Sequence, residues 1–405
     1  MKMSKINKIF SILLFAFMSV LILNSCEEET PDVLAEKDGP ATITYIRSTN
    51  PEISDSLYTG AFMGSLIAIV GDNLGDTKEI WFNDQKALLQ PNYITDKSII
   101  VSVPSTVPTE ITDKMRIVFS DKSELLYDFK VLVPAPLVKT AKCEYVPEGQ
   151  LLELTGDFFF NPVVTFQGGA QGKIISVEKT KMTVEVPAGA LAGPVVVKTL
   201  FGSAASKWWF RENRGMILDL DNLRGGGWRT HDDRLQSAGG ISGNYAVLEA
   251  KLEADNDWKD NWLEIDVWGQ AGGRPAGPLF RGDINNLQLK FEANVVNNWQ
   301  AGFMQFIFSP YTNNGNAVNT DPTIARGMWH PWYESATTNK PFKTDGWVTV
   351  GIPLSEFIYN DNKQINTLKL NCPDNCGSLT IFVRGPLGAV SDVKILIDNV
   401  RVVPL

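Results

Sequence analysis

Two carboxylates, Glu264 and Asp266, stand two positions apart in the segment Leu-Glu-Ile-Asp-Val-Trp at residues 263–268. Apolar and polar residues alternate here, which predicts a half-buried β-strand with both carboxylates on one face. A retaining glycosidase presents such a pair to a glycosidic bond, with the carboxyl groups about 5–5.5 Å apart. The first question is therefore whether the chain cleaves a sugar or only holds one.

The position after this pair argues against cleavage. The segment resembles the catalytic phrase of jelly-roll endoglucanases of the laminarinase type, in which Glu, Asp and a second Glu alternate along one strand. Glu264 and Asp266 match that phrase, but Trp268 stands where the acid/base carboxylate is required. No second phrase offers an acid from another strand. We therefore expect no enzyme, and keep a jelly-roll endo-glycoside hydrolase as an alternative.

Aromatic residues supply the other chemistry. Eight of the eleven Trp lie after residue 211, at positions 228, 258, 262, 268, 299, 329, 332 and 347. A flat indole can stack on the apolar face of a pyranose ring while amides and carboxylates bind its hydroxyls. The enrichment predicts that some of these Trp are exposed to hold carbohydrate. A surface adhesin that binds protein is a further alternative.

The segment Arg-Gly-Met-Trp-His-Pro-Trp-Tyr at residues 326–333 is the first candidate, because Pro331 disfavours a central strand and three large aromatics are hard to bury together. For Trp258, Trp262 and Trp299 the alternative is a loop anchor. The predicted carbohydrate-binding residues are Trp329, Trp332, Tyr333, Trp258, Trp262, Trp299, Gln305 and Tyr311.

The net charge and the small number of potential metal ligands argue against two other classes of function. The formal net charge of -9 argues against nucleic acid, which requires clustered cations. Two His and no Cys-x-x-Cys pair argue against zinc, and no cofactor is expected. A structural calcium ion shared by Asp219, Asp221 and Asp398 is one interpretation of those carboxylates, and turn capping is the other.

The N-terminus reads as an export signal. Lys2, Lys5 and Lys8 precede an apolar run at residues 9–23 that is short for a membrane span. Leu-Asn-Ser-Cys at residues 23–26 resembles a bacterial lipobox, which implies acylation of Cys26, and the following Glu-Glu-Glu resembles a surface-export signal. The alternative is an ordinary signal peptide with an incidental Cys.

The other three Cys lie in the mature chain. Export permits disulfides, and Cys372 and Cys376 are close enough to close a tight loop, although strain at that spacing leaves their pairing open. Cys143 is expected to be a buried free thiol.

Residues 40–211 consist of short β-runs separated by turns, and the pattern occurs twice. Residues 64–74 align with 149–159, and 98–104 with 181–187, each of the latter ending in Val-Pro. This pattern resembles two copies of the IPT/TIG immunoglobulin-like fold, which implies rigid spacer domains.

After residue 211 the predicted strands are not separated by long helices, which indicates an antiparallel jelly roll. Gly-Trp-Val-Thr-Val-Gly-Ile-Pro-Leu-Ser-Glu-Phe at residues 346–357 and Ile-Asp-Asn-Val-Arg-Val at 397–402 resemble phrases of carbohydrate-binding jelly rolls. With the lipobox and the repeats, the whole chain resembles the surface glycan-binding proteins of Bacteroidetes polysaccharide-utilisation loci.

This resemblance implies an all-β lipoprotein on the outer surface of the outer membrane. It would capture a polysaccharide, such as a β-linked plant glucan or hemicellulose, beside an outer-membrane glycan transporter complex and surface glycosidases. The expected organisation is a signal peptide at 1–25, an acidic tether at 26–39, tandem immunoglobulin-like β-sandwiches at 40–134 and 135–211, and a jelly-roll β-sandwich at 212–405.

Overall fold

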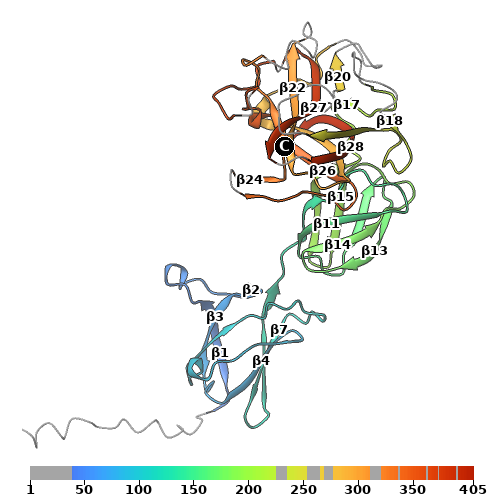
Figure 1. The fold of residues 1–405 in the computed structure, drawn as a ribbon. Helices are drawn as coiled ribbons and strands as arrows, with labels where there is room; N and C mark the ends of the chain where they lie inside the picture. Colours follow the sequence, from blue (N-terminus) through green and yellow to red (C-terminus); the bar gives the residue numbers. More distant parts are fainter. Residues whose placement is uncertain are drawn as a thin grey trace, which may run out of the picture. The chain divides into compact units, whose positions relative to one another are not determined.

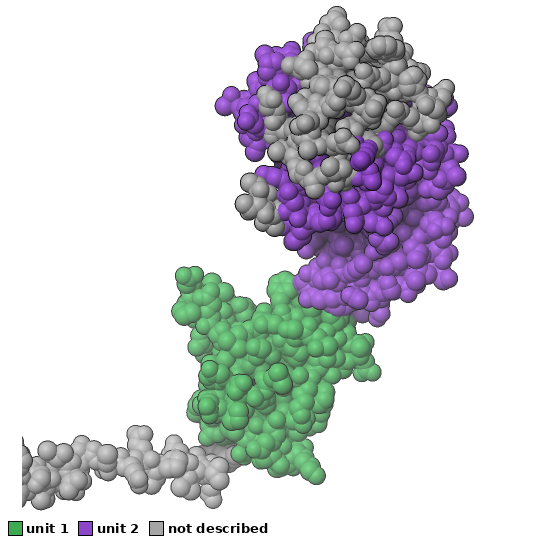
Figure 2. All heavy atoms as spheres, viewed as in Figure 1, with its two compact units in different colours: residues 1–133 green, residues 134–405 purple. Residues whose placement is uncertain are grey.

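The computed structural model describes residues 39–224, 235–252, 265–268, 277–310, 321–335, 338–361, 364–372, 374–388 and 391–405. Within these ranges the regular elements are β-strands and short 3₁₀ helices, so the predicted all-β class with several sandwich sheets is confirmed (Figure 1). No helix among the described residues is long and apolar enough to cross a membrane. The chain divides into two compact units, Met1–Val133 and Pro134–Leu405 (Figure 2).

The first unit, called the N-terminal unit, pairs strands in the orders β1-β3-β6, β5-β4-β7-β8 and β2-β9 around a core that includes Ile67, Ile80 and Ile117. Its elements are β1 Thr42–Ser48, η1 Pro51–Ile53, β2 Gly60–Phe62, β3 Leu66–Asp72, β4 Thr77–Phe82, β5 Gln85–Lys86, η2 Pro91–Tyr93, β6 Ser98–Ser102, β7 Lys114–Phe119, β8 Glu124–Asp128 and β9 Lys130–Leu132.

The second unit begins with seven strands in the order β10-β11-β14-β13-β12-β15-β16, called the second sandwich. Its own core includes Leu152, Val184 and Phe210. The strands are β10 Leu137–Ala141, β11 Leu151–Asp157, β12 Val163–Gln167, β13 Gln171–Val177, β14 Lys181–Glu185, β15 Leu191–Thr199 and β16 Gly202–Phe210.

The internal repeat has a shared structural cause. Gly71 and Gly156 occupy equivalent places, in β3 opposite β1 and in β11 opposite β10, each next to a register shift. A Cβ at Gly71 would lie 1.9 Å from the carbonyl oxygen of Thr42, and one at Gly156 would lie 1.9 Å from that of Leu137. Only glycine allows two strands to approach this closely. The repeated glycine therefore marks the same bulged pairing in both sandwiches.

The remainder of the second unit, called the C-terminal sandwich, stacks two main sheets. One has the order β18-β19-β28-β21-β26, with β17 on β28, and the other has the order β20-β27-β22-β23. The elements are β17 Met216–Leu218, β18 Leu235–Gln236, β19 Tyr245–Leu252, β20 Ile265–Trp268, η4 Ile284–Asn286, β21 Leu287–Val295, β22 Ala301–Pro310, β23 Gly327–Trp329, β24 Tyr333–Ser335, β25 Thr338–Asn339, β26 Val348–Pro353, η5 Leu354–Glu356, β27 Cys376–Gly388 and β28 Ser391–Pro404.

Side-chain alternation explains why the two sheets of the C-terminal sandwich pack. Alternate residues of β21 and β22 are buried between them, and the Phe291 and Phe306 rings meet at 5.0 Å. Burying such rings removes apolar surface from water, which is the main favourable term in folding. The long central pair of β22 and β27 supports the short strand β23 at one edge of its sheet.

A buried ionic cluster joins the second sandwich to the C-terminal sandwich. Arg401 on β28 donates to Glu144 at 2.7 Å and, through Nη1, to Glu292 on β21 at 2.8 Å. Lys290 also contacts Glu144, at 2.6 Å. The charged groups of Arg401, Glu144 and Glu292 are all buried, so each carboxylate needs the Arg401 guanidinium to offset its loss of water.

Candidate functional site

A hollow of about 580 Å³ lies at the edge of the C-terminal sandwich, beside β23. Its lining is mainly aromatic and apolar, with one carboxylate, and we call it the aromatic hollow. The lining residues are Met328, Trp329, His330, Pro331, Tyr333, Ile352, Glu356, Ile358 and Tyr359. Most of them come from the segment that the sequence marked as the first candidate.

Local structure positions these side chains. Trp329 ends β23 in register with Met304 of β22, and its half-buried indole packs edge-on against Trp299 at 5.3 Å and Phe291 at 5.5 Å. After Pro331 the chain turns, and the Tyr333 N–H donates to the carbonyl oxygen of His330. These contacts fix the position of the Trp329 ring.

The rings around His330 form a compact cluster. Its centroid lies 4.8 Å from Phe303, 5.6 Å from Tyr333 and 6.1 Å from Tyr359, each in an edge-to-face arrangement. Burial lowers the pKa of His330 below its ordinary value. The imidazole is therefore neutral at pH 7 and offers one donor and one acceptor.

Polar atoms line the same hollow. Burial, and then the nearby Glu356 and Tyr333, raise the pKa of Tyr359, which keeps this phenol protonated as a hydrogen-bond donor. Glu356 is exposed, and Tyr333 is 36% exposed. Flat rings with hydroxyl and carboxylate groups at their edges match the two kinds of surface on a pyranose ring.

Three predicted binding residues are core residues instead, which corrects the expectation from sequence. Trp299 and Trp332 are both fully buried, and their indole N–H groups donate to the carbonyl oxygens of Ala301 and Gly302. Gln305 is also fully buried and accepts from Arg326 at 3.3 Å. Because both indoles are buried and both indole N–H groups are bonded inside the sandwich, neighbouring core residues cover the ring faces. No ring face is left for a sugar to stack on.

Other predicted residues, Trp258, Trp262, Tyr311 and Cys26, together with Glu264, lie outside the described residues. Among the lining residues that carry polar groups, the sequence analysis did not predict His330, Glu356 and Tyr359. His330 stood inside the candidate segment and was passed over. Tyr359 lies in a later segment of the chain, and a backbone bridge to Arg326 brings it to the aromatic hollow. No local sequence pattern predicts this pairing.

The carboxylates considered for calcium accept hydrogen bonds from neighbouring groups. Asp219 accepts from the backbone N–H groups of Asn222 and Leu223, and Asp221 accepts from Asn244. Asp398 accepts from the Ser242 hydroxyl at 2.8 Å. The backbone hydrogen bonds to Asp219 and Asp221 favour the capping interpretation. Within the described ranges no group of three or more Asp, Glu, His or Cys is placed to hold a metal ion.

Among the described residues, two cysteines form a disulfide and the third is a free thiol. Cys372 and Cys376, whose pairing the sequence left open, form a disulfide with their Cα atoms 4.8 Å apart. Cys143 is a buried free thiol, as predicted, and burial raises its pKa.

Comparison with known proteins decides the family. Residues 210–404 match the family described as surface glycan-binding protein B xyloglucan binding domain. An IPT/TIG domain-containing protein of Bacteroides ovatus is 30% identical over 387 residues, covering 86% of this chain and 77% of that protein. The chain belongs to the surface glycan-binding protein B family.

A solved structure agrees along nearly the whole chain. Surface glycan-binding protein PbSGBP-B from Prevotella bryantii is 30% identical, with a TM-score of 0.73, and the match covers 91% of this chain and 99% of that one. This surface glycan-binding protein is therefore a binder rather than an enzyme, which confirms the conclusion drawn from Trp268. The same similarity confirms the expected resemblance and places the protein at the cell surface.

Proposed function

We propose that the protein captures a β-linked plant glucan or hemicellulose, with xyloglucan as the first ligand to test, and that the aromatic hollow is where the sugar binds. The observation that carries this proposal is the hollow itself, in which Trp329, Tyr333 and Tyr359 meet beside the Glu356 carboxylate. The description of the matched family as a xyloglucan-binding domain supports the choice of ligand.

The expected strength follows from the number of rings. Stacking of a planar group on an aromatic side chain contributes about 1–3 kcal/mol per ring, by analogy with nucleic-acid bases. The aromatic hollow offers two or three such rings, so affinity in the micromolar to millimolar range is expected. Weak capture is sufficient for a protein that is held on a surface and meets a repeating polymer, because neighbouring sugars raise the effective concentration.

Affinity electrophoresis against xyloglucan, mixed-linkage β-glucan, mannan and starch tests the proposal. Tyr333→Ala and Tyr359→Ala should each restore mobility toward that of the free protein on the gel that retards the native chain. Tyr93→Ala is the matched control, because Tyr93 is a tyrosine 54% exposed in the N-terminal unit. Retardation that persists in the Tyr333→Ala/Tyr359→Ala double variant would contradict the site.

We further propose that Cys26 carries the lipid that anchors the protein to the outer membrane, beside a glycan transporter complex and surface glycosidases. The lipobox-like segment at residues 23–26 and the acidic run after it support this anchor. Metabolic labelling with a palmitate analogue should mark the native chain but not Cys26→Ala, while Cys143→Ala should remain labelled. A labelled Cys26→Ala variant would contradict the anchor.

A further inference from the structure

The Glu356 carboxylate gives the aromatic hollow a negative charge without a counter-charge. Glu356 is exposed, and the residues that line the hollow include no lysine or arginine. Within the part of the chain that the structure describes, its carboxylate forms no ion pair and no hydrogen bond. The wall at which we propose that the sugar binds therefore carries one unpaired carboxylate.

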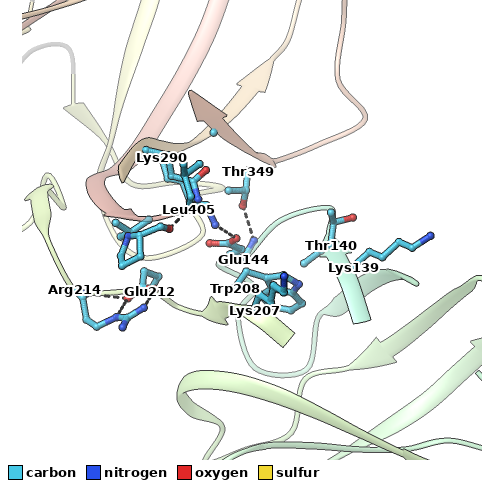
Figure 3. A pocket seen from close by; sticks show the side chains of 15 residues that line it. Lys139, Thr140, Glu144, Lys207, Trp208, Glu212, Arg214, Lys290, Thr349 and Leu405 are labelled. Carbon is cyan, nitrogen blue, oxygen red and sulfur yellow. Dashed lines mark hydrogen bonds and ion pairs between the residues drawn. The ribbon is translucent and has the colours of Figure 1, made fainter. Parts of the chain in front are cut away.

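A second hollow, of about 490 Å³ between the second sandwich and the C-terminal sandwich, has the opposite arrangement (Figure 3). Both acidic side chains in its lining are already paired. Glu144 contacts Lys290 at 2.6 Å, and Glu212 contacts Arg214 at 2.6 Å. Those carboxylates are engaged in holding the fold, whereas the carboxylate of Glu356 is left to act on a ligand.

Local structure fixes the position of Glu356. It ends η5, and the residues Leu354 and Phe357 on either side of it are fully buried. The Phe357 N–H donates to the carbonyl oxygen of Leu354, and the Phe357 ring packs so closely on Gly327 that a Cβ there would lie 2.6 Å from it. The turn is therefore held against β23 by two buried anchors, and the charged side chain between them stays at the hollow.

The charge acts on the wall that carries Tyr359. Burial, and after it the Glu356 carboxylate, raise the pKa of Tyr359, so the charge is felt at that phenol. The carboxylate of Glu334, which follows Tyr333 in the chain, is bound by Lys340 at 2.8 Å and does not line the hollow. A sugar beside Tyr359 would therefore meet a phenol donor and one unpaired carboxylate.

Such a carboxylate treats neutral and acidic sugars differently. It accepts hydrogen bonds from the hydroxyl groups of a neutral sugar, and hydrogen bonds to a charged group are the stronger kind. It repels the carboxylate of a uronic acid, because two like unit charges about 4 Å apart in water lower affinity about fivefold. A lysine or arginine in the lining would reverse this preference, and the lining has neither.

We propose that Glu356 makes the aromatic hollow selective for neutral glycans over acidic ones, by accepting hydrogen bonds from sugar hydroxyls and repelling uronic acid carboxylates. The inference rests on the proposed function, because it assigns a role within the same site. It restricts the ligand to polysaccharides whose sugar at the hollow is uncharged.

Isothermal titration of the full chain at low ionic strength tests this selectivity. The two probes are xyloglucan and xyloglucan whose primary hydroxyls have been oxidised to carboxylates, which share a backbone and differ in charge. The native chain should bind the oxidised form more weakly, by about fivefold or more. Glu356→Gln keeps the shape of the side chain and removes its charge, so it should lower the ratio of the two dissociation constants about fivefold. Added salt should lower that ratio in the native chain.

The control corrects for the net charge of -9, which also repels an acidic polymer. Glu178→Gln removes the same charge from an exposed position in the second sandwich and should leave the ratio unchanged. An equal ratio in the native chain and in Glu356→Gln would overturn the proposal, even if Tyr333→Ala and Tyr359→Ala weaken xyloglucan binding as the proposed function requires. Xyloglucan binding that neither tyrosine variant weakens would contradict the proposed function and this inference together.

Discussion

Arg401 and Glu144 form a fully desolvated ion pair at 2.7 Å, although they stand 257 residues apart in the sequence. The pair joins β28 of the C-terminal sandwich to the loop that follows β10 in the second sandwich. Glu292 takes the other side of the Arg401 guanidinium, and the Tyr145 ring lies 5.1 Å from it. The second sandwich and the C-terminal sandwich are therefore joined within one compact unit, Pro134–Leu405.

Glu144→Ala should destabilise the second unit by about 3–5 kcal/mol, because it leaves the largely buried Lys290 without its carboxylate and Arg401 with Glu292 alone. Urea unfolding followed by tryptophan fluorescence measures the change. Glu178→Ala, an exposed glutamate in the same sandwich, should stay within about 0.5 kcal/mol of the native chain. Equal unfolding midpoints for the two variants would show that the pair contributes nothing to stability.

Asp398→Asn should change the pH dependence of stability. Burial raises the pKa of Asp398 to about 7, above the value of about 3.9 for an unfolded chain. Between these values the native state binds more protons than the unfolded state, so this group lowers the free energy of unfolding as pH rises from 4 to 7.

Asparagine cannot ionise, so the stability of Asp398→Asn relative to the native chain should increase between pH 5 and pH 8. Chemical unfolding at both pH values gives that difference, in which the other titrating groups cancel. A difference that does not change with pH would contradict the raised pKa.

Gly156→Ala and Gly71→Ala should have similar costs, since each added Cβ would lie 1.9 Å from a carbonyl oxygen of the paired strand. Overpacking of this kind costs about 1–3 kcal/mol, and the strands must separate locally to relieve it. Thermal unfolding of each variant, with the exposed Ser176→Ala as control, measures the effect. A neutral result at both glycines would mean that the bulged pairing is not required.

Trp332→Phe should affect stability and Tyr333→Ala should affect glycan affinity, although the two residues are adjacent. Trp332→Phe removes the hydrogen bond to Gly302, and we expect a loss of about 1–3 kcal/mol in stability with unchanged glycan affinity. Tyr333→Ala should weaken glycan binding by about 1–3 kcal/mol with little change in stability. Parallel unfolding and affinity electrophoresis measurements distinguish the two, and a reversed pattern would return Trp332 to the site.

The positions of several strands along the chain were predictable because side-chain alternation is a local property. The alternating segment at residues 263–268, predicted as a strand, contains β20, Ile265–Trp268. The Val-Pro repeat and the repeated Gly-Asp likewise marked equivalent strands, since a close strand approach requires glycine wherever it occurs. The predicted class of protein followed from these local phrases and from Trp268.

Local patterns did not separate the exposed aromatic residues from the buried ones. Trp329, Trp332 and Tyr333 share one short segment, yet the chain buries Trp332 and leaves Tyr333 at the surface. That outcome depends on a hydrogen bond from Trp332 to Gly302 on β22, about thirty residues earlier in the chain, and on the turn after Pro331.

The sequence by itself indicated an all-β chain, because side-chain alternation acts residue by residue, and its local phrases resembled those of surface glycan-binding proteins. The tertiary structure decided which rings line the aromatic hollow, that Tyr359 is one of them, and that Glu144, Glu292 and Arg401 meet across two sandwiches. Those contacts connect residues far apart in the sequence, and their free energy exists only once the strands between them have paired.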